Sequence, residues 1–358
     1  MSTLTVVDKS TMSVDELYEE LKFRIGEYTP DFELRLQAEL AHEINQLKRE
    51  RNAVILGHNY MEPALFHTVP DFVGDSLDLS RKAARTDKDV IVFCGVRFMA
   101  ETAKILNPSR TVLLPSLKAG CSLAASITAE DVRALRKQFP GVPVVTYVNT
   151  YADVKAESDI CCTSSNAVAV VESLHADTVI FLPDQYLAAN VARESGKHII
   201  FPTLDPRRLT SGATDLLDVQ MIGWHGRCEV HEKFTVKDIE TVRAQFPDVV
   251  ILAHPECSPE VVAASDFSGS TNAMIRHVQQ TKAAHYLLLT ECSMGDNVAA
   301  ANPDKEMLRL CMVRCPHMNT ITMEQTRDAL LHLQYVIEVP EDIRLRAFQA
   351  VDRMIRIG

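Results

Sequence analysis

The chain has 358 residues, enough for two or three domains, and its 46% hydrophobic and 24% charged residues are ordinary for a globular protein. Its net charge of −11 is spread along the sequence without a Lys/Arg cluster, which argues against nucleic-acid binding. The N-terminus lacks the apolar core of a signal peptide, and no apolar run is long enough to span a membrane. We therefore expect a cytoplasmic protein whose nine cysteines stay reduced.

Strand and helix patterns alternate in three similar units along most of the chain. Each unit starts with an apolar strand, passes a polar turn that opens a helix, and ends at a cysteine. The expected strands are 52–57, 90–95 and 111–117 in the first unit, 142–148, 178–183 and 198–202 in the second, and 249–256 and 285–290 in the third. Amphipathic helices are expected before the units, over 13–50, and after them, over 342–357.

The spacing of polar residues supports this register. In each unit we compare the position of the polar residue at the end of the first strand with that of the closing cysteine. These two residues are His58 and Cys121 in the first unit, Asn149 and Cys228 in the second, and His254 and Cys315 in the third. The separations are 63, 79 and 61 residues, so the second unit is longer than the others. Its excess falls on the polar stretch 203–222, which we expect to be an insertion and to which the sequence assigns no role.

Alternating strands and helices with β-branched strands predict an α/β protein with parallel sheets covered by helices. In such folds the ligands bind beyond the carboxyl ends of the strands, so three modules facing inward would enclose a central cavity. The boundaries that we predict are an N-terminal helical segment at 1–50, repeat modules at 51–125, 142–235 and 248–320, and a C-terminal helical segment at 321–358.

Hydroxyl side chains precede the first helix of each module, at Ser76, Ser164, Ser165, Ser270 and Thr271. Helix N-capping explains any one of them. Three such positions in equivalent places also indicate converging helix N-termini, which favour a bound phosphate or carboxylate. We therefore expect an anionic substrate.

Polar residues at the expected strand ends are candidate binding and catalytic groups: His58, Tyr60, Tyr147, Asn149, His254 and Glu256. A lone histidine at a strand end is usually structural, but His58 and His254 occupy matching positions. Glu256 follows His254 by two residues, on the same side of an extended segment, where the pair can share acid–base work. For the two tyrosines, substrate orientation and core packing both remain open.

One cysteine closes each unit, which indicates a ligand set of Cys121, Cys228 and Cys315 around one centre. Three thiolates without a histidine favour an iron–sulfur cluster over a catalytic zinc. The missing fourth ligand leaves an open position at which a metal acts as a Lewis acid. On the residues alone, a zinc protein stays an alternative.

Nine segments, in chain order across residues 50–320, resemble the quinolinate synthase family. They are GHNY at 57–60, GDSLDLS at 74–80, GVRFMAETAKIL at 95–106, YVNT at 147–150, TSSNA at 163–167, CEVH at 228–231, HPE at 254–256, GST at 269–271 and CPHM at 315–318. The resemblance implies three α/β/α modules about a pseudo-threefold axis, with the active site and an oxygen-sensitive 4Fe-4S cluster at the centre, bound by Cys121, Cys228 and Cys315.

The resemblance also implies a function, that of a transferase in NAD (pyridine nucleotide) biosynthesis. The enzyme would condense iminoaspartate with dihydroxyacetone phosphate to quinolinate, releasing phosphate and two waters, with the open iron as Lewis acid. Its partners would be these two small molecules, with a functional link to the enzyme that supplies iminoaspartate.

Residue roles follow from the same resemblance, position by position. The implied catalytic residues are Glu256, His254, Tyr60 and His58. The implied substrate-binding residues are His58, Ser76, Tyr147, Asn149, Ser164, His254, Glu256, Ser270 and Thr271.

Two functions of other classes remain open on the residues. An aconitase-like hydro-lyase with an open-iron cluster would use one substrate and release no phosphate. A non-enzymatic iron–sulfur redox sensor would need a regulatory partner surface or a DNA-binding module.

Overall fold

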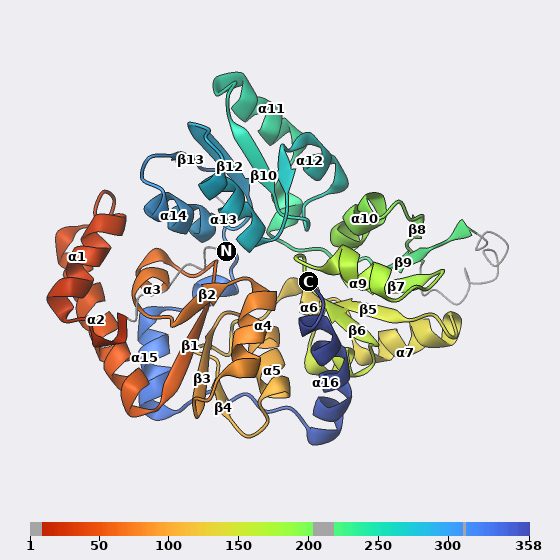
Figure 1. Cartoon of the computed structure of the whole chain (residues 1–358), viewed down its shortest axis with the longest axis horizontal. Coiled ribbons are helices and arrows are strands. Elements are labelled where there is room, and N and C mark those ends of the chain that lie inside the picture. Colours follow the sequence, from red (N-terminus) through yellow and green to blue (C-terminus); the bar gives the residue numbers. More distant parts are fainter. Residues whose placement is uncertain (1–8, 203–217, 311–312) are drawn as a thin grey trace.

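Three all-parallel sheets with helices around them form the framework of the protein (Figure 1). The computed structural model describes residues 9–202, 218–310 and 313–358. The α/β class and the short parallel sheets flanked by helices confirm the prediction from the sequence. The domain boundaries that we drew around the modules stay a prediction.

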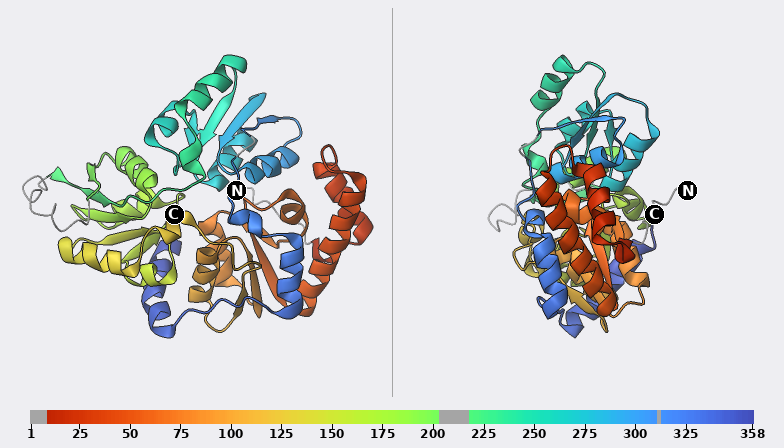
Figure 2. Two further views of the ribbon diagram at one scale, coloured as in Figure 1. Left: turned by 180° about the vertical axis from the view of Figure 1, so that it is seen from behind. Right: turned by 90° about the vertical axis from the view of Figure 1, so that its left-hand side faces the viewer.

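The first sheet has the order β2-β1-β3-β4, with bounds Phe72–Gly74, Ala53–His58, Val90–Cys94 and Thr111–Leu113. Every residue of β1 and β3 is buried, which is why both strands are uninterrupted apolar runs. Figures 1 and 2 show helices on both faces. The helices are α4 (Ser76–Arg85) and α5 (Arg97–Leu106) on one face, and α2 (Asp31–Glu50) and α15 (Met323–His332) on the other.

The second sheet repeats this order and adds one strand, as β6-β5-β7-β9-β8. The bounds are Ile160–Cys162, Val144–Tyr147, Val179–Leu182, Met221–Gly223 and Ile199–Ile200. Its helices are α6 (Ser122–Ala125), α7 (Ala129–Gln138), α8 (Ala152–Ala156), α9 (Ala167–Ser173) and α10 (Gln185–Glu194).

The added strand revises our interpretation of the second unit. We expected residues 198–202 to match β4, but β8 lies at the outer edge of the sheet, and β9 takes the place next to β7. Burial explains the order, because Met221 and Ile222 are buried whereas both residues of β8 are only half-buried. The strand β9 begins inside the stretch 203–222, of which residues 203–217 lie outside the described part of the chain.

The third sheet has the order β11-β10-β12-β13, with bounds Phe267–Ser268, Val250–Ala253, His285–Leu289 and Glu306–Leu308. Its helices are α11 (Val236–Gln245), α12 (Pro259–Ala264), α13 (Thr271–Gln280) and α14 (Cys292–Ala301). The remaining elements are η1 (Lys9–Thr11), α1 (Val14–Ile25), α3 (Pro63–Thr68), η3 (His231–Lys233), η4 (Met318–Thr320) and α16 (Glu341–Ile355).

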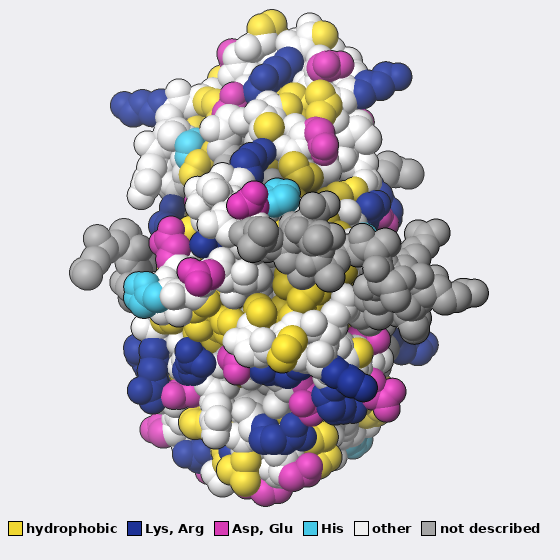
Figure 3. All heavy atoms as spheres, turned by 90° about the vertical axis from the view of Figure 1, so that its right-hand side faces the viewer, with side chains coloured by type: hydrophobic (Ala, Val, Ile, Leu, Met, Phe, Trp, Pro, Cys, Tyr) yellow, Lys and Arg dark blue, Asp and Glu magenta, His cyan; other side chains and the backbone are white. Residues whose placement is uncertain are grey.

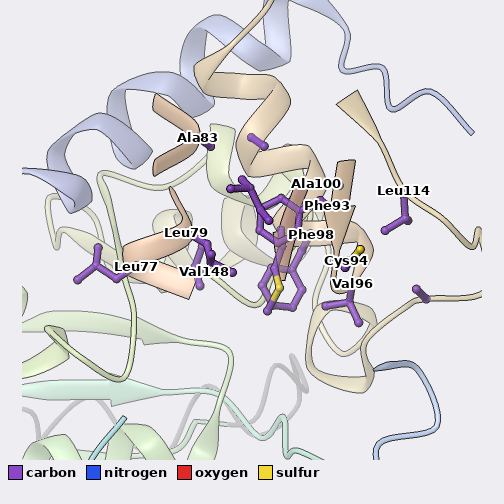
Figure 4. Close-up of a cluster of buried hydrophobic side chains, with 14 of the residues drawn as sticks. Leu77, Leu79, Ala83, Phe93, Cys94, Val96, Phe98, Ala100, Leu114 and Val148 are labelled. Atoms are coloured by element: carbon purple, nitrogen blue, oxygen red, sulfur yellow. The ribbon is translucent and has the colours of Figure 1, made fainter. Parts of the chain in front are cut away.

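The first two units share one hydrophobic core. Leu77 and Leu79 of α4, Phe93 of β3 and Phe98 of α5 belong to the same buried cluster as Val148, which follows β5 of the second unit (Figure 4). The helix α16 strengthens this junction, because it contacts α5 of the first unit and both α8 and β6 of the second. The second unit has a further buried cluster of its own, and the third unit has two buried clusters around its sheet.

The surface carries both signs of charge. On the face seen in Figure 3, Lys and Arg side chains are interspersed with Asp and Glu side chains. Among the described helices, none combines the length and the apolar composition that crossing a membrane requires.

His67 of α3 is a buried base that links stability to pH. Burial, followed by nearby Arg24 and Lys9, lowers the pKa of His67 to about 3, and its Nε2 has no hydrogen-bond partner among the described residues. The folded state therefore binds fewer protons than the unfolded state between pH 6.5 and about 3. Above pH 6.5, His67 therefore does not reduce the free energy of unfolding. As the pH falls below 6.5, the free energy of unfolding decreases, because only the unfolded state readily binds a proton at His67.

We predict that replacing His67 with Leu removes part of the acid sensitivity of the fold. Between pH 6.5 and pH 4 the unfolding free energy of the natural chain should fall by about 3 kcal/mol more than that of the variant. Denaturant unfolding at the two pH values measures this difference, with the exposed His332→Leu as the matched control. Equal pH dependence in the natural chain and in His67→Leu would contradict the assignment.

Candidate active site

A cavity of about 690 Å³ lies where the three units meet. Twelve of the thirteen site residues expected from the sequence line the cavity: His58, Tyr60, Ser76, Cys121, Tyr147, Asn149, Ser164, Cys228, His254, Glu256, Thr271 and Cys315. The exception is Ser270, which is buried and is not part of the lining.

The carboxyl ends of three equivalent strands supply one side of the cavity. His58 is the last residue of β1, Tyr147 is the last residue of β5, and His254 follows β10 directly. Each of these strands lies in the same place in its sheet, between the second and third strands of its unit. The position of the site thus follows from the topology of parallel sheets.

His58 and His254 make the same local hydrogen bond. The Nδ1 atom of each ring accepts a hydrogen bond from the backbone N–H two residues further on, that of Tyr60 and Glu256, at 3.3 Å. Burial lowers the pKa of His58 to about 4 and that of His254 to about 3, so both rings are neutral at pH 7. A neutral ring that accepts at Nδ1 carries its proton on Nε2, which leaves each histidine one N–H donor for a ligand.

The N-termini of three helices form a second side of the cavity, but, contrary to our expectation, not all of the serines are N-caps. Asp75 caps α4, with its side chain accepting from the Asp78 N–H, and Asn166 occupies the cap position of α9 without a side-chain cap bond. Only Ser270 is a cap, accepting from the Ala273 N–H at 3.4 Å. Aspartate caps helices as well as serine does, so the sequence pattern did not distinguish Asp75 from Ser76.

Asp75 also joins two units. The Ser165 hydroxyl donates to Asp75 Oδ2 at 2.6 Å, while Oδ1 accepts from the Asp78 N–H at 3.0 Å. Asp75 lines the cavity beside Ser76, and sequence reasoning missed it. Its hydrogen bonds hold the start of α4 against the turn that carries Ser164.

The three cysteines share one local turn. The backbone N–H groups two and three residues after each cysteine approach its sulfur: Leu123 and Ala124, Val230 and His231, and His317 and Met318. The bond from the Met318 N–H to Cys315 Sγ measures 3.5 Å. Hydrogen bonds of this kind to thiolate sulfur are one of the means by which proteins tune iron–sulfur clusters.

These thiols stay protonated in the absence of a metal. Burial raises the pKa of Cys121 to about 12 and that of Cys315 to about 11, and it raises the pKa of Cys228 well above its ordinary range. All three are free cysteines that face one cavity and belong to three different units. The donor set, with two N–H groups directed at each sulfur, fits a cluster held by three thiolates and having one open position.

A repeat that we overlooked confirms the equivalence of these turns. Seven residues after each cysteine stands a threonine whose side chain caps the next helix in a capping box: Thr128 with Asp131, Thr235 with Asp238, and Thr322 with Gln325. The helices that follow are α7, α11 and α15. The constant spacing was visible in the sequence, and it locates the insertion of the second unit before Cys228.

Glu256 is a buried carboxylate of the third unit whose partners come from the second unit. Its Oε1 accepts from the Tyr147 hydroxyl at 2.5 Å and from Asn149 Nδ2 at 3.3 Å, and its Oε2 lies 2.8 Å from His231 Nδ1. Burial alone raises the pKa of Glu256, but the contacts with His231 and Tyr147 outweigh burial and hold that pKa below its ordinary value. Glu256 is therefore ionised at neutral pH despite being buried.

A hydrogen-bonded chain extends from Glu256 to Tyr60. His231 Nε2 lies 3.0 Å from the Thr290 hydroxyl, which lies 2.6 Å from the Tyr60 hydroxyl. Because a carboxylate only accepts, His231 donates at Nδ1, and its Nε2 shares a further hydrogen bond with the Thr290 hydroxyl. The Thr290 hydroxyl also shares a hydrogen bond with Tyr60, whose pKa is raised well above its ordinary value by burial and by Glu256.

Sequence reasoning missed His231 and Thr290. His231 follows Cys228 by three residues in the CEVH segment, so its proximity to the cysteine was a usable signal. Thr290 directly follows β12, and nothing in its sequence context distinguishes it from other residues at strand ends.

Comparison with known proteins identifies the family. The family model described as "NadA: Quinolinate synthetase A protein" matches residues 42–356. The chain belongs to the quinolinate synthase family. This confirms the resemblance drawn from the nine sequence segments.

Individual relatives agree with this assignment over most of their length. Quinolinate synthase 2 of Mesorhizobium japonicum is 55% identical over 314 residues, covering 88% of this chain and 90% of the relative. Quinolinate synthase of Sinorhizobium medicae is 48% identical over 343 residues, covering 96% and 88%. Quinolinate synthase of Agrobacterium fabrum is 54% identical over 314 residues, covering 88% and 84%. Membership of this family supports an enzyme that acts on small molecules.

Proposed function

We propose that the protein is a quinolinate synthase, a transferase that condenses iminoaspartate with dihydroxyacetone phosphate to quinolinate, one phosphate and two waters. The observation that carries the proposal is one cavity in which three equivalent cysteine turns face a buried, ionised Glu256. The reaction balances without an oxidant or a reductant. A non-redox role for the metal centre is therefore sufficient.

Cys121, Cys228 and Cys315 are the residues that would hold a 4Fe-4S cluster, whose open iron supplies a Lewis acid for the dehydration steps. The thiol protons must leave when the cluster binds, and the N–H groups at each turn then stabilise the thiolates. Free thiols of this kind support a cytoplasmic location. We assign the product to NAD biosynthesis, downstream of the enzyme that supplies iminoaspartate.

The substrates carry two carboxylates and one phosphate, and the cavity offers donors for such groups. The rings of His58 and His254 are neutral, and their Nε2–H groups can donate hydrogen bonds to an anion. The N-terminal residue of α4, Ser76, and that of α13, Thr271, line the same cavity with Ser164. Helix N-termini favour bound phosphate and carboxylate groups.

Glu256 and Tyr60 are suited to opposite proton transfers. Glu256 is held as a carboxylate and can accept a proton from carbon or nitrogen during condensation and ring closure. Tyr60 keeps its proton at neutral pH and can donate it to a leaving oxygen. Through Thr290 and His231 the two groups form one connected hydrogen-bond system.

The direct test is an anaerobic assay of cluster-loaded protein with both substrates. We predict one quinolinate and one phosphate per turnover, measured by chromatography and by a phosphate assay on the same samples. Water loss from a single substrate without phosphate release would overturn the proposal in favour of an aconitase-like hydro-lyase.

Replacing Glu256 with Gln should abolish quinolinate formation, because an amide cannot accept the proton. The visible spectrum of the loaded cluster should not change, since Glu256 is not among the three thiolate ligands. The matched control is Glu260→Gln, an exposed residue four positions further along, which should keep normal activity. Normal turnover by Glu256→Gln would reject its role as the base.

Replacing Thr290 with Val keeps the shape of the side chain but breaks the chain between Tyr60 and His231. We predict that kcat falls by roughly 10- to 100-fold with little change in KM, because the reacting groups lose their alignment. Thr290→Ser, which retains the hydroxyl, should restore most of the rate. In a Tyr60→Phe background, Thr290→Val should lower kcat little further. Equal losses of kcat in Thr290→Val and Thr290→Ser would argue against this role of the hydroxyl.

A further inference from the structure

Cys228, His231 and Glu256 bring a sulfur, a nitrogen and an oxygen donor together in the cavity. Cys228 Sγ, His231 Nδ1 and Glu256 Oε2 all lie within 4.8 Å of one another. His231 Nδ1 is central to the group, at 3.2 Å from the sulfur and 2.8 Å from the carboxylate oxygen. Only Cys228 belongs to the three-thiolate set described above.

The geometry matches a tetrahedral divalent ion after a small adjustment. With usual zinc–ligand bond lengths, the nitrogen lies roughly 3.4 Å from the oxygen and roughly 3.6 Å from the sulfur. His231 Nδ1 therefore has to separate from each of the other two donors by only about half an ångström to admit the ion. The fourth position would face the cavity, which all three residues line.

Glu256 and His231 are also fixed by further contacts on the side away from the ion, as metal ligands usually are. The Glu256 carboxylate is fixed by Tyr147 and Asn149 through its other oxygen, and Thr290 contacts the far nitrogen of His231. The ring of His231 is stacked on that of His254, with centroids 4.6 Å apart. Such outer contacts orient ligands and commonly change metal affinity by 10- to 100-fold.

We infer that the cluster-free protein binds one divalent ion of the zinc class at Cys228, His231 and Glu256. A mixed sulfur, nitrogen and oxygen set suits zinc, whereas an iron–sulfur cluster takes thiolates from three units. The two sites share Cys228, so they are mutually exclusive. A zinc-bound chain would be unable to accept the cluster, and its Glu256 would be engaged by the metal.

The proton balance of this binding is simple. The Cys228 thiol releases one proton to solvent as its sulfur binds the ion. His231 binds the ion as a neutral ring, since Nδ1 must offer its lone pair to the metal. The ring proton then lies on Nε2, where the Thr290 oxygen accepts it.

The inference depends on the proposed function only through the shared Cys228, and its test needs no enzyme activity. Cluster-free protein, prepared anaerobically, is titrated with Co²⁺, whose ligand-field bands are intense only in a tetrahedral site. We expect one equivalent per chain, with a thiolate-to-metal charge-transfer band and with displacement of Co²⁺ by Zn²⁺.

Variants decide which residues hold the ion. His231→Phe and Glu256→Gln should each weaken Co²⁺ binding by on the order of 100-fold. Cys121→Ser and Cys315→Ser should bind Co²⁺ like the natural protein. Loss of binding in Cys121→Ser or Cys315→Ser, or full binding in both His231→Phe and Glu256→Gln, would overturn the inference.

A competition experiment tests the exclusion of the cluster. Saturating Zn²⁺ should slow cluster uptake from iron and sulfide by on the order of tenfold or more in the natural protein. His231→Phe keeps all three cysteines, so it should take up the cluster at the same rate with and without Zn²⁺, which also shows that the variant is folded. Cluster uptake by the natural protein that is insensitive to Zn²⁺ would contradict mutual exclusion.

Discussion

The burial of the Glu256 carboxylate is the constraint on which the centre of this protein depends. A buried charge is tolerated only where hydrogen bonds and nearby positive or polar groups replace the lost water. Here Tyr147 and Asn149 come from the second unit, His231 from the turn that closes it, and Glu256 itself from the third. Tyr60 of the first unit joins through Thr290. The three units must therefore keep a fixed arrangement if Glu256 is to remain ionised.

The cysteine turns and the helices after them form the repeated part of that arrangement. In each unit a cysteine, two inward N–H groups and a capping-box threonine at a constant spacing of seven residues lead into α7, α11 or α15. Each turn is followed by a helix whose first residues are fixed by a capping box. The additional strand of the second sheet, β8, lies upstream of this turn in the sequence.

The sequence predicted the features that depend on long apolar runs. The strands β1, β5 and β10 were recognisable because parallel strands are buried on both faces, and their carboxyl ends located His58, Tyr147 and His254. Short strands such as β11 were missed because two residues carry no periodicity. Asp75 and Thr290 could not be identified because their roles depend on contacts with residues 90 and 230 positions away in the sequence.

The central claim is that one cysteine from each unit holds a single cluster. Iron and sulfide per chain after anaerobic reconstitution test it most directly, in the natural chain and in Cys121→Ser, Cys228→Ser and Cys315→Ser, with the core variant Cys94→Ala as control. The account predicts about four irons per chain in the natural protein and in the control, and loss of the cluster in the three serine variants. A full iron content in any of these three variants would contradict it.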